Sequence, residues 1–331
     1  MVEWSLAGLE LTPEVPADTT AERAAAAEAA GLDTVLMACH YNNRDPFAAL
    51  ALAARKTETV QLGPAAANPY EVHPVTLASR IATLQETAGG RALFGLAAGD
   101  RSTLRSLGID RERPLRRVLE TMRVSRKLLA GDRVEHDGTF TAPDAGLNYA
   151  VPPVPTYIGA QGPDMLRMAG KHADGVLVNA AHPEEYTWAA DRIAEGAAAR
   201  SPGRADVDVV AYAATSVAAD VERARDAARP PVAFIAASAP DPVLDRHGID
   251  GEIAARIGAK IEAGAFSAAF EMVTPAMIEV FAVAGTPAVV AERLTALGAY
   301  VDGIVAGAPL GPDVDEAISL VAEAIDRSVP G

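Results

Sequence analysis

The 331-residue sequence contains one cysteine, Cys39, so no disulfide bond can form within the chain. No stretch approaches the roughly 18 consecutive apolar residues that a membrane-spanning helix requires. The opening residues, MVEWSLAGLEL, lack a basic region and a cleavage site, so we expect no signal peptide. These absences predict a cytoplasmic protein that does not bind membranes.

Basic residues are also scarce. The chain has 29 Lys and Arg against 44 Asp and Glu, a net charge of −15, and only four of the basic residues are lysines. Nucleic acid attracts Lys and Arg, so an acidic chain is not expected to bind it. Few lysines and many carboxylates are typical of a salt-adapted protein, whose self-repulsion is screened, or of a GC-rich genome. The composition leaves both explanations open.

Several common catalytic motifs are missing. The sequence has no GxSxG, no Walker loop and no GxGxxG after a first strand. Its six histidines never occur with an acid at the helical spacing of a two-histidine metal site, so we expect no metal. Cys39 has no evident activating pair and is not expected to be a nucleophile.

The clearest local pattern is a βαβ unit over residues 62–100. Pro74 suits the first turn of a helix, and from Val75 apolar residues recur at helical spacing. Gly89-Gly90 ends this helix. An apolar strand lies on each side of it.

Similar alternation runs through the whole chain. The predicted strands are residues 4–11, 33–39, 60–63, 92–97, 154–158, 175–178, 207–216 and 300–306. Strands that alternate with helices form a parallel sheet, and eight such units predict a (β/α)8 TIM barrel in a single domain, residues 1–331. A doubly wound open sheet is the alternative.

Two stretches depart from the alternation. Residues 218–286 are too long for one crossover helix, so they predict a helical insertion between the seventh and eighth strands, without a clear strand and interrupted at Pro230-Pro231. Residues 133–153 are rich in Pro and Gly and predict an irregular surface excursion.

Polar and small residues follow the predicted strands. They are Glu10, residues 40–43, residues 65–68, Asp100, residues 159–163, Asn179 and Thr215. Because the working face of such a barrel lies at the carboxyl ends of its strands, we expect these residues to form a single site.

The segment Gly159-Ala160-Gln161-Gly162-Pro163 joins a predicted strand to a predicted helix. Its glycines permit close backbone approach, and a helix N-terminus favours phosphate. Arg167 and Lys171 could assist. A plain strand-to-helix turn would use the same residues.

Two carboxylates are candidate proton donors. Glu10 ends the first predicted strand, where burial in a barrel mouth would favour the protonated form. A salt bridge is the alternative role for Glu10. Asp100 is the second candidate, and an N-cap for the helical turn that follows is its alternative role.

Several motifs taken together resemble one family. They are HYNN (residues 40–43), NPYEVHP (68–74), GAQGP (159–163) and VAFIAAS (232–238), with AxxxATL and GGR in the central unit. In combination they resemble the bacterial-luciferase-like barrels. Within that group they resemble the coenzyme F420-dependent 5,10-methylenetetrahydromethanopterin reductases, from about Gly8 to Ile325.

This resemblance implies a set of site residues. F420, a deazaflavin, would be bound by His40, Asn42, Ala65, Ala66, Asn68, Gly159, Ala160, Gln161, Gly162 and Asn179. Phe234 and His247 would contact the tetrahydropterin substrate, and Glu10 would donate the proton. The resemblance also implies a non-proline cis peptide at Ala65-Ala66. Cys39 stands where the family commonly has Asp, and Ala65 where it usually has Gly.

The implied reaction is hydride transfer between reduced F420 and the methylene carbon of 5,10-methylenetetrahydromethanopterin, giving the 5-methyl form, in a homo-oligomeric enzyme. Three alternatives remain open at this point. They are the same reaction on methylenetetrahydrofolate, an FMN-dependent monooxygenase of the same fold, and a non-catalytic cofactor-binding protein.

Overall fold

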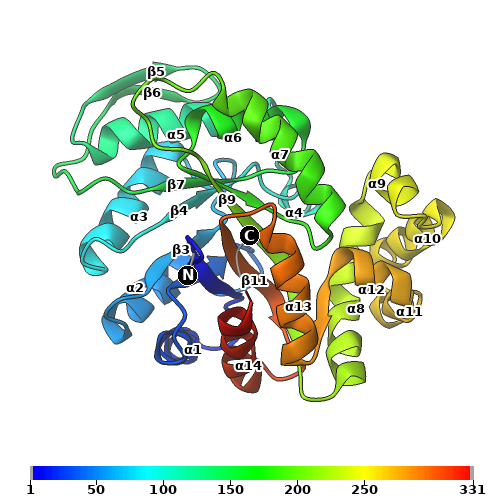
Figure 1. Ribbon diagram of the computed structural model, residues 1–331. Coiled ribbons are helices and arrows are strands. Elements are labelled where there is room, and N and C mark those ends of the chain that lie inside the picture. Colours follow the sequence, from blue (N-terminus) through cyan, green and yellow to red (C-terminus); the bar gives the residue numbers. More distant parts are fainter. Residues whose placement is uncertain (1–2, 329–331) are drawn as a thin grey trace. The chain divides into compact units, whose positions relative to one another are not determined.

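The computed structural model describes residues 3–328, in which strands and helices alternate along the chain (Figure 1). These residues fall into two compact units. The first unit comprises Glu10–Val178 and Ala189–Val210. The second comprises residues 3–9, 179–188 and 211–328. No helix within residues 3–328 is both long enough and apolar enough to cross a membrane.

Five strands of a parallel sheet lie wholly within the first unit. They are β2 (Thr34–Ala38), β3 (Gln61–Ala65), β4 (Phe94–Leu96), β7 (Thr156–Gly159) and β8 (Gly175–Val178). β2 pairs with β3, β4 with β7 and β7 with β8, and isolated bridges join β3 to the β4 segment. Every residue of β2, β4 and β8 is buried, as expected for a parallel sheet covered on both faces.

Helices connect these strands. They are α1 (Ala17–Ala29), α2 (Pro46–Lys56), α3 (Pro74–Thr87), α4 (Arg101–Ser106), α5 (Pro114–Leu129) and α6 (Pro163–His172). Four of them, α2, α3, α5 and α6, begin with proline, whose fixed φ suits the first turn. α1 packs against α2, α2 against α3, α3 against α5 and α5 against α6.

Glycine allows β3 and β4 to approach closely. A Cβ at Gly63 would lie 2.2 Å from the Leu93 carbonyl oxygen, and one at Gly95 would lie 2.0 Å from that of Pro64. Both distances are far inside van der Waals contact. The loop after β3 therefore takes its position from glycines on both strands.

The prediction for residues 133–153 was wrong in part. Within this stretch, β5 (Val134–Asp137) and β6 (Thr141–Ala145) form an antiparallel hairpin. Val134, Phe140 and Ala142 pack with residues of α3 and α5. Both strands carry exposed polar residues, so the sequence shows no continuous apolar run there.

The second unit contains further parallel pairings. β1 (Ala7–Leu11) pairs through residues 7–9 with β11 (Gly303–Leu310), and β9 (Asp208–Val217) pairs through residues 215–217 with β10 (Val283–Gly285). Each of the eight predicted strands is therefore present; the strand predicted at residues 175–178 has those bounds, and the ends of the others are shifted by a few residues. β10 was not predicted, because three residues give too short a pattern to be recognised.

The predicted helical insertion is confirmed. It consists of α8 (Val221–Ser238), α9 (Asp241–Arg246), α10 (Gly251–Glu262), α11 (Phe266–Glu271) and α12 (Pro275–Phe281). The predicted interruption was wrong, because α8 continues through Pro230 and Pro231. Val232, Ile257 and Met277, each at most 1% exposed, belong to the apolar core of this region. The assignment of the whole chain to one domain stays a prediction.

Three helices complete the chain, and their bounds are α7 (Pro183–Ala197), α13 (Pro287–Gly298) and α14 (Val314–Arg327). α13 packs against α14, and both belong to the second unit.

Candidate functional site

The candidate site of the first unit lies where its strands end. A cavity of about 280 Å³ opens beside the loops after β2 and β3. Its lining residues are Cys39, His40, Tyr41, Asn43, Arg44, Asp45, Pro46, Phe47, Ala67, Asn68, Glu71, Val72, Leu77 and Arg80. Of the predicted cofactor contacts, His40 and Asn68 line the cavity. Glu71 and Arg80 were missed, since a single charged residue on a predicted helix or loop carries no distinct signal.

Asn68 organises the loop after β3. Asn68 is 6% exposed, and its Nδ2 donates to Glu71 at 2.7 Å. Its Oδ1 accepts from the backbone N–H of Tyr70 at 3.1 Å and of Glu71 at 3.0 Å. Asn68 therefore fixes this loop through its own hydrogen bonds, and a role in cofactor binding stays a prediction.

The predicted cis peptide is confirmed at Ala65-Ala66. Alanine in place of the expected glycine at position 65 does not prevent it. Directly after it, Ala67 forms a parallel bridge with Leu96 of β4. The next turn is held by Tyr70, whose hydroxyl donates to the Glu112 carbonyl at 2.6 Å and whose ring lies 4.8 Å from the Arg117 guanidinium.

Glu10 is only 5% exposed, and its carboxylate accepts a hydrogen bond from Thr12 Oγ1 at 3.1 Å. It lies close enough to Cys39 to act on it electrostatically. Burial, and then the charges of Glu10 and Glu71, raise the pKa of the Cys39 thiol far above its usual range. Cys39 therefore stays protonated at neutral pH, which supports the prediction that it is not a nucleophile. Glu10 is not among the residues that line the cavity, and its role as proton donor stays a prediction.

Asp100 has a different environment. It is the N-cap of α4, and its carboxylate accepts from the Thr103 N–H at 2.8 Å and from the Ser102 hydroxyl. Partial burial raises the pKa of Asp100, but these hydrogen bonds outweigh that effect and leave the pKa below its ordinary value. The N-cap interpretation is confirmed. A carboxyl that is ionised this readily is a poor proton donor at neutral pH.

The segment from Gly159 to Pro163 joins β7 to α6 as predicted. Gly162 is the N-cap of α6, no side chain caps that end, and a Cβ at Gly162 would meet nothing within 4 Å. Ala160 is 5% exposed, and its N–H donates to the Leu177 carbonyl of β8 at 3.1 Å. The N-terminus of α6 therefore follows a glycine with open space at its Cβ position, and anion binding there stays a prediction.

The two side chains expected to assist lie at different distances from this helix end. Lys171 lies in the last turn of α6, about 12 Å along the helix axis from its first turn at 1.5 Å per residue. Arg167 is held by Asp164 at 3.2 Å and by Glu195 at 2.5 Å. The assistance of Arg167 and the anion site itself stay predictions.

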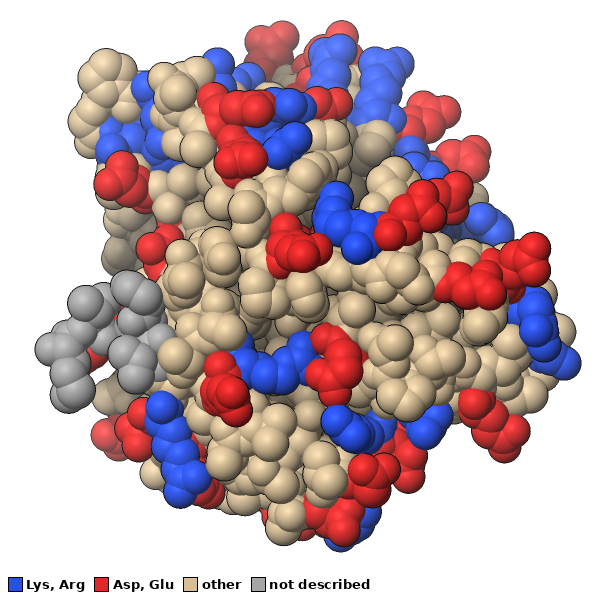
Figure 2. All heavy atoms as spheres, turned by 45° about the vertical axis from the view of Figure 1, so that its right-hand side comes forward, with Lys and Arg blue, Asp and Glu red and all other residues tan. Residues whose placement is uncertain are grey.

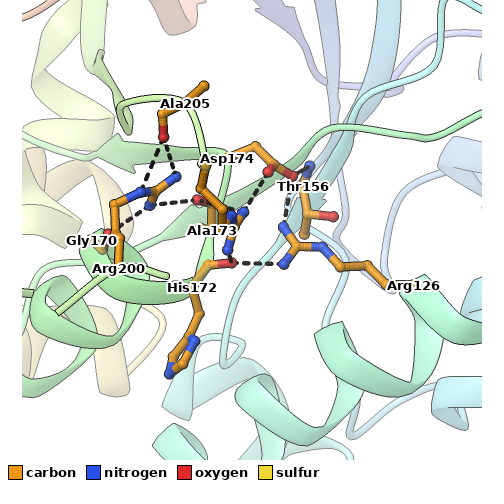
Figure 3. A network of polar contacts seen from close by, with 9 residues as sticks. Arg126, Thr156, Gly170, His172, Ala173, Asp174, Arg200 and Ala205 are labelled. Carbon is orange, nitrogen blue, oxygen red and sulfur yellow. Dashed lines mark hydrogen bonds and ion pairs between the residues drawn. The ribbon is translucent and has the colours of Figure 1, made fainter. Parts of the chain in front are cut away.

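Three arginines hold the other end of α6 (Figure 3). Arg126 and Arg204 both donate to the His172 carbonyl, at 2.7 and 2.8 Å, and Arg200 donates to the carbonyls of Gly170 and Ala173. Asp174 lies between two of the guanidinium groups. Its carboxylate oxygens are 2.7 Å from Arg126 and from Arg204. The cations satisfy the free carbonyls and the negative end of the helix dipole.

Three of the predicted residues belong to the second unit. Asn179 is exposed directly after β8. Phe234, on α8, is 47% exposed, and its ring centroid lies 6.3 Å from those of Phe266 and Phe270. His247 ends α9 with its side chain 4% exposed, and its Nε2 is 2.9 Å from Glu185. Their roles in binding stay predictions.

Comparison with known proteins places this arrangement among related enzymes. Residues 4–303 match the family model described as luciferase-like monooxygenase. The 5,10-methylenetetrahydromethanopterin reductase of Archaeoglobus fulgidus is 39% identical over 96% of this chain and 98% of its own. The 5,10-methylenetetrahydromethanopterin reductase of Methanolobus tindarius is 41% identical over 96% of this chain and 98% of its own.

Solved structures give the same result. The coenzyme F420-dependent tetrahydromethanopterin reductase of Methanopyrus kandleri superimposes with a TM-score of 0.88 at 38% identity, covering 97% of each chain. An F420-dependent secondary alcohol dehydrogenase has a TM-score of 0.79 at 20% identity and covers 98% of this chain and 99% of its own, which shows a shared fold. The predicted (β/α)8 barrel of the luciferase-like type is confirmed.

Proposed function

Because this chain belongs to the luciferase-like monooxygenase family, and within it to the methylenetetrahydromethanopterin reductases, we propose that it is an F420-dependent oxidoreductase acting on a CH–NH group. The reaction is the transfer of a hydride between reduced F420 and the methylene carbon of 5,10-methylenetetrahydromethanopterin, giving the 5-methyl form. The observation that carries this proposal is the similarity to the Methanopyrus kandleri reductase over 97% of the chain.

The residues of the first unit fit the cofactor. F420 carries a phosphate and an acidic tail, and the uncapped N-terminus of α6 after Gly162 offers backbone N–H groups to such an anion. The cis peptide at Ala65-Ala66 lies where the resemblance expects the loop that supports the ring. When bound, reduced F420 supplies the hydride. The chain's own task is to orient the ring and the substrate, which is worth several kcal/mol of the barrier.

Glu10 is the residue we propose as proton donor. Opening the five-membered ring of the methylene substrate requires a proton on the departing nitrogen. Glu10 is 5% exposed and acts electrostatically on Cys39, which lines the cavity. Asp100 is the second candidate, and its hydrogen bonds favour the ionised form. The geometry therefore favours Glu10.

The pterin and the cofactor can be tested together. We expect F420 to quench protein fluorescence at lower concentration than FMN, and the F420-loaded enzyme to turn over methylenetetrahydromethanopterin faster than methylenetetrahydrofolate. Tighter FMN binding would support a monooxygenase. Faster turnover of methylenetetrahydrofolate would identify the folate as the substrate. F420 binding without turnover of either pterin would indicate a non-catalytic cofactor-binding protein.

We also propose that the chain forms a homo-oligomer. Size-exclusion chromatography with light scattering measures its mass directly. A mass of one chain at all concentrations would contradict this.

A further inference from the structure

Two histidines and a glutamate from distant parts of the sequence meet in the second unit. His182 and Glu184 flank Pro183 at the start of α7, and His247 ends α9. One potential ligand atom from each lies within 4.8 Å of the others. The two imidazole rings lie edge to face, with centroids 4.5 Å apart.

A fourth side chain orients one of these histidines. Glu185 lies 2.9 Å from His247 Nε2 and is also paired with Arg246. A proton on Nε2 shared with that carboxylate leaves the lone pair of His247 on Nδ1. Nδ1 lies 4.0 Å from a carboxylate oxygen of Glu184. Metal-binding histidines almost always donate their other ring N–H to such an acceptor.

The ligand set suits zinc. Zn²⁺ prefers imidazole nitrogen and carboxylate oxygen at about 2.0–2.2 Å in tetrahedral geometry, and three protein ligands leave one position for water. Ligand atoms in that geometry are about 3.3 Å apart, so the cluster must contract slightly. The Glu184 side chain is 59% exposed and can rotate inward. The Nδ1 of His182 accepts a long hydrogen bond of 3.3 Å from the Glu184 N–H. On binding the metal through Nδ1, His182 would lose this hydrogen bond and gain a bond to Zn²⁺.

We propose that His182, Glu184 and His247 form a Zn²⁺ site that joins the start of α7 to the end of α9. The site uses no residue of the first unit. It therefore stands or falls independently of the proposed reductase activity.

The test is metal binding by the chelator-stripped full chain, titrated with Zn²⁺ in a calorimeter and with Co²⁺ followed by visible absorption. We expect one equivalent of Zn²⁺, tetrahedral Co²⁺ bands and a higher melting temperature with metal. Glu184→Gln and His182→Gln should each abolish the Co²⁺ bands. Glu185→Gln should weaken Zn²⁺ binding by about 10–100-fold.

His172→Gln is the matched control, because it removes a histidine of the first unit and should bind Zn²⁺ like the wild type. His247 is buried and ion-paired, so replacing it can unfold this region. Glu184 is mostly exposed, and Glu184→Gln keeps the test valid. Unchanged Zn²⁺ affinity in Glu184→Gln and His182→Gln, or no saturable binding by the wild type, would overturn the proposal.

Discussion

Glu10 and Asp100 are both carboxylates at the ends of strands in the sequence, but the structure separates their roles. Asp100 is exposed and caps α4, where hydrogen bonds to its oxygens favour the charged form. Glu10 is buried beside Thr12. At the residue scale the two can be distinguished by replacing each carboxylate with its amide.

Glu10→Gln keeps the volume of the side chain and removes the transferable proton. We expect kcat to fall by roughly 10²–10⁴, with little change in F420 affinity. Asp100→Asn is the control, because Asn caps a helix about as well as Asp and activity should persist. Steady-state kinetics with thermal melts measure both. Near wild-type turnover in Glu10→Gln, with loss in Asp100→Asn, would exchange the two assignments.

Glu120 on α5 should make stability depend on acid pH. Its carboxylate accepts from the Thr139 N–H and hydroxyl, both at 2.7 Å, and lies 3.2 Å from His136 Nε2. Burial raises the pKa of Glu120, but these and other hydrogen bonds lower it from 4.5 to about 2. A lowered folded-state pKa stabilises the fold above the unfolded value and loses this contribution as pH falls.

We therefore expect wild type to melt above Glu120→Gln at neutral pH. The difference between them should shrink as pH falls from 4.5 toward 2. Other carboxylates titrate in both proteins, so the difference isolates Glu120. Melting temperatures of both proteins measured across this pH range test the prediction. A difference in melting temperature that does not change with pH would contradict it.

At the scale of elements, the C-terminal end of α6 depends on Asp174. Asp174→Asn leaves two guanidinium groups without their shared carboxylate, and we expect it to lower the free energy of unfolding by about 1–3 kcal/mol. Asp191→Asn breaks a more exposed pair with Arg192 and should cost about 0–1 kcal/mol. Urea denaturation measures the free energy of unfolding of both variants. Equal losses would show that the network in Figure 3 stabilises the fold no more than an exposed ion pair does.

The close approach of β3 and β4 can be tested at Gly95. The Cβ of an alanine at position 95 would collide with the Pro64 carbonyl oxygen. We therefore expect Gly95→Ala to lower the free energy of unfolding by about 1–3 kcal/mol and to weaken F420 binding. Gly258→Ala, in α10 with its nearest neighbour at 3.6 Å, should stabilise by about 0.5–1 kcal/mol. Unfolding and fluorescence titrations measure both effects. If Gly95→Ala bound F420 as tightly as the wild type, the close approach of β3 and β4 would not determine the position of the loop after β3.

Elements with a strong local pattern could be predicted from the sequence. The buried strand TVLMA and the proline-started helix at Pro74 are examples. β10 could not be predicted from the sequence, because its three residues form a strand only by pairing with Thr215 to Val217. α8 was expected to break at its prolines, yet packing of Val232 and its neighbours maintains the helix.

For the whole molecule, the charge of −15 predicts a dependence on salt. On the face drawn in Figure 2, acidic and basic side chains are interspersed, so the excess of acid is spread over that surface. Screening such diffuse repulsion should raise the melting temperature in molar KCl relative to dilute buffer. Thermal melts across a salt series measure this, and a flat or falling trend would favour the GC-rich-genome explanation.

The candidate site shows the limit of prediction at this scale. Residues at or shortly after the carboxyl end of a strand, such as Glu10 and Gly162, could be placed because the strand order fixes where they lie. His182 and His247, or Arg126 and Asp174, meet only through tertiary packing. No spacing in the sequence indicates such pairs.

Cys39 has a practical consequence for experiments on this protein. A thiolate attacks the double bond of a maleimide, and the raised pKa favours the unreactive protonated thiol of Cys39 at neutral pH. Because Cys39 is the only cysteine in the chain, the natural sequence already provides a quiet background for site-directed labelling. We expect a cysteine introduced at the exposed position Leu107 to react with a maleimide faster than the half-buried Cys39.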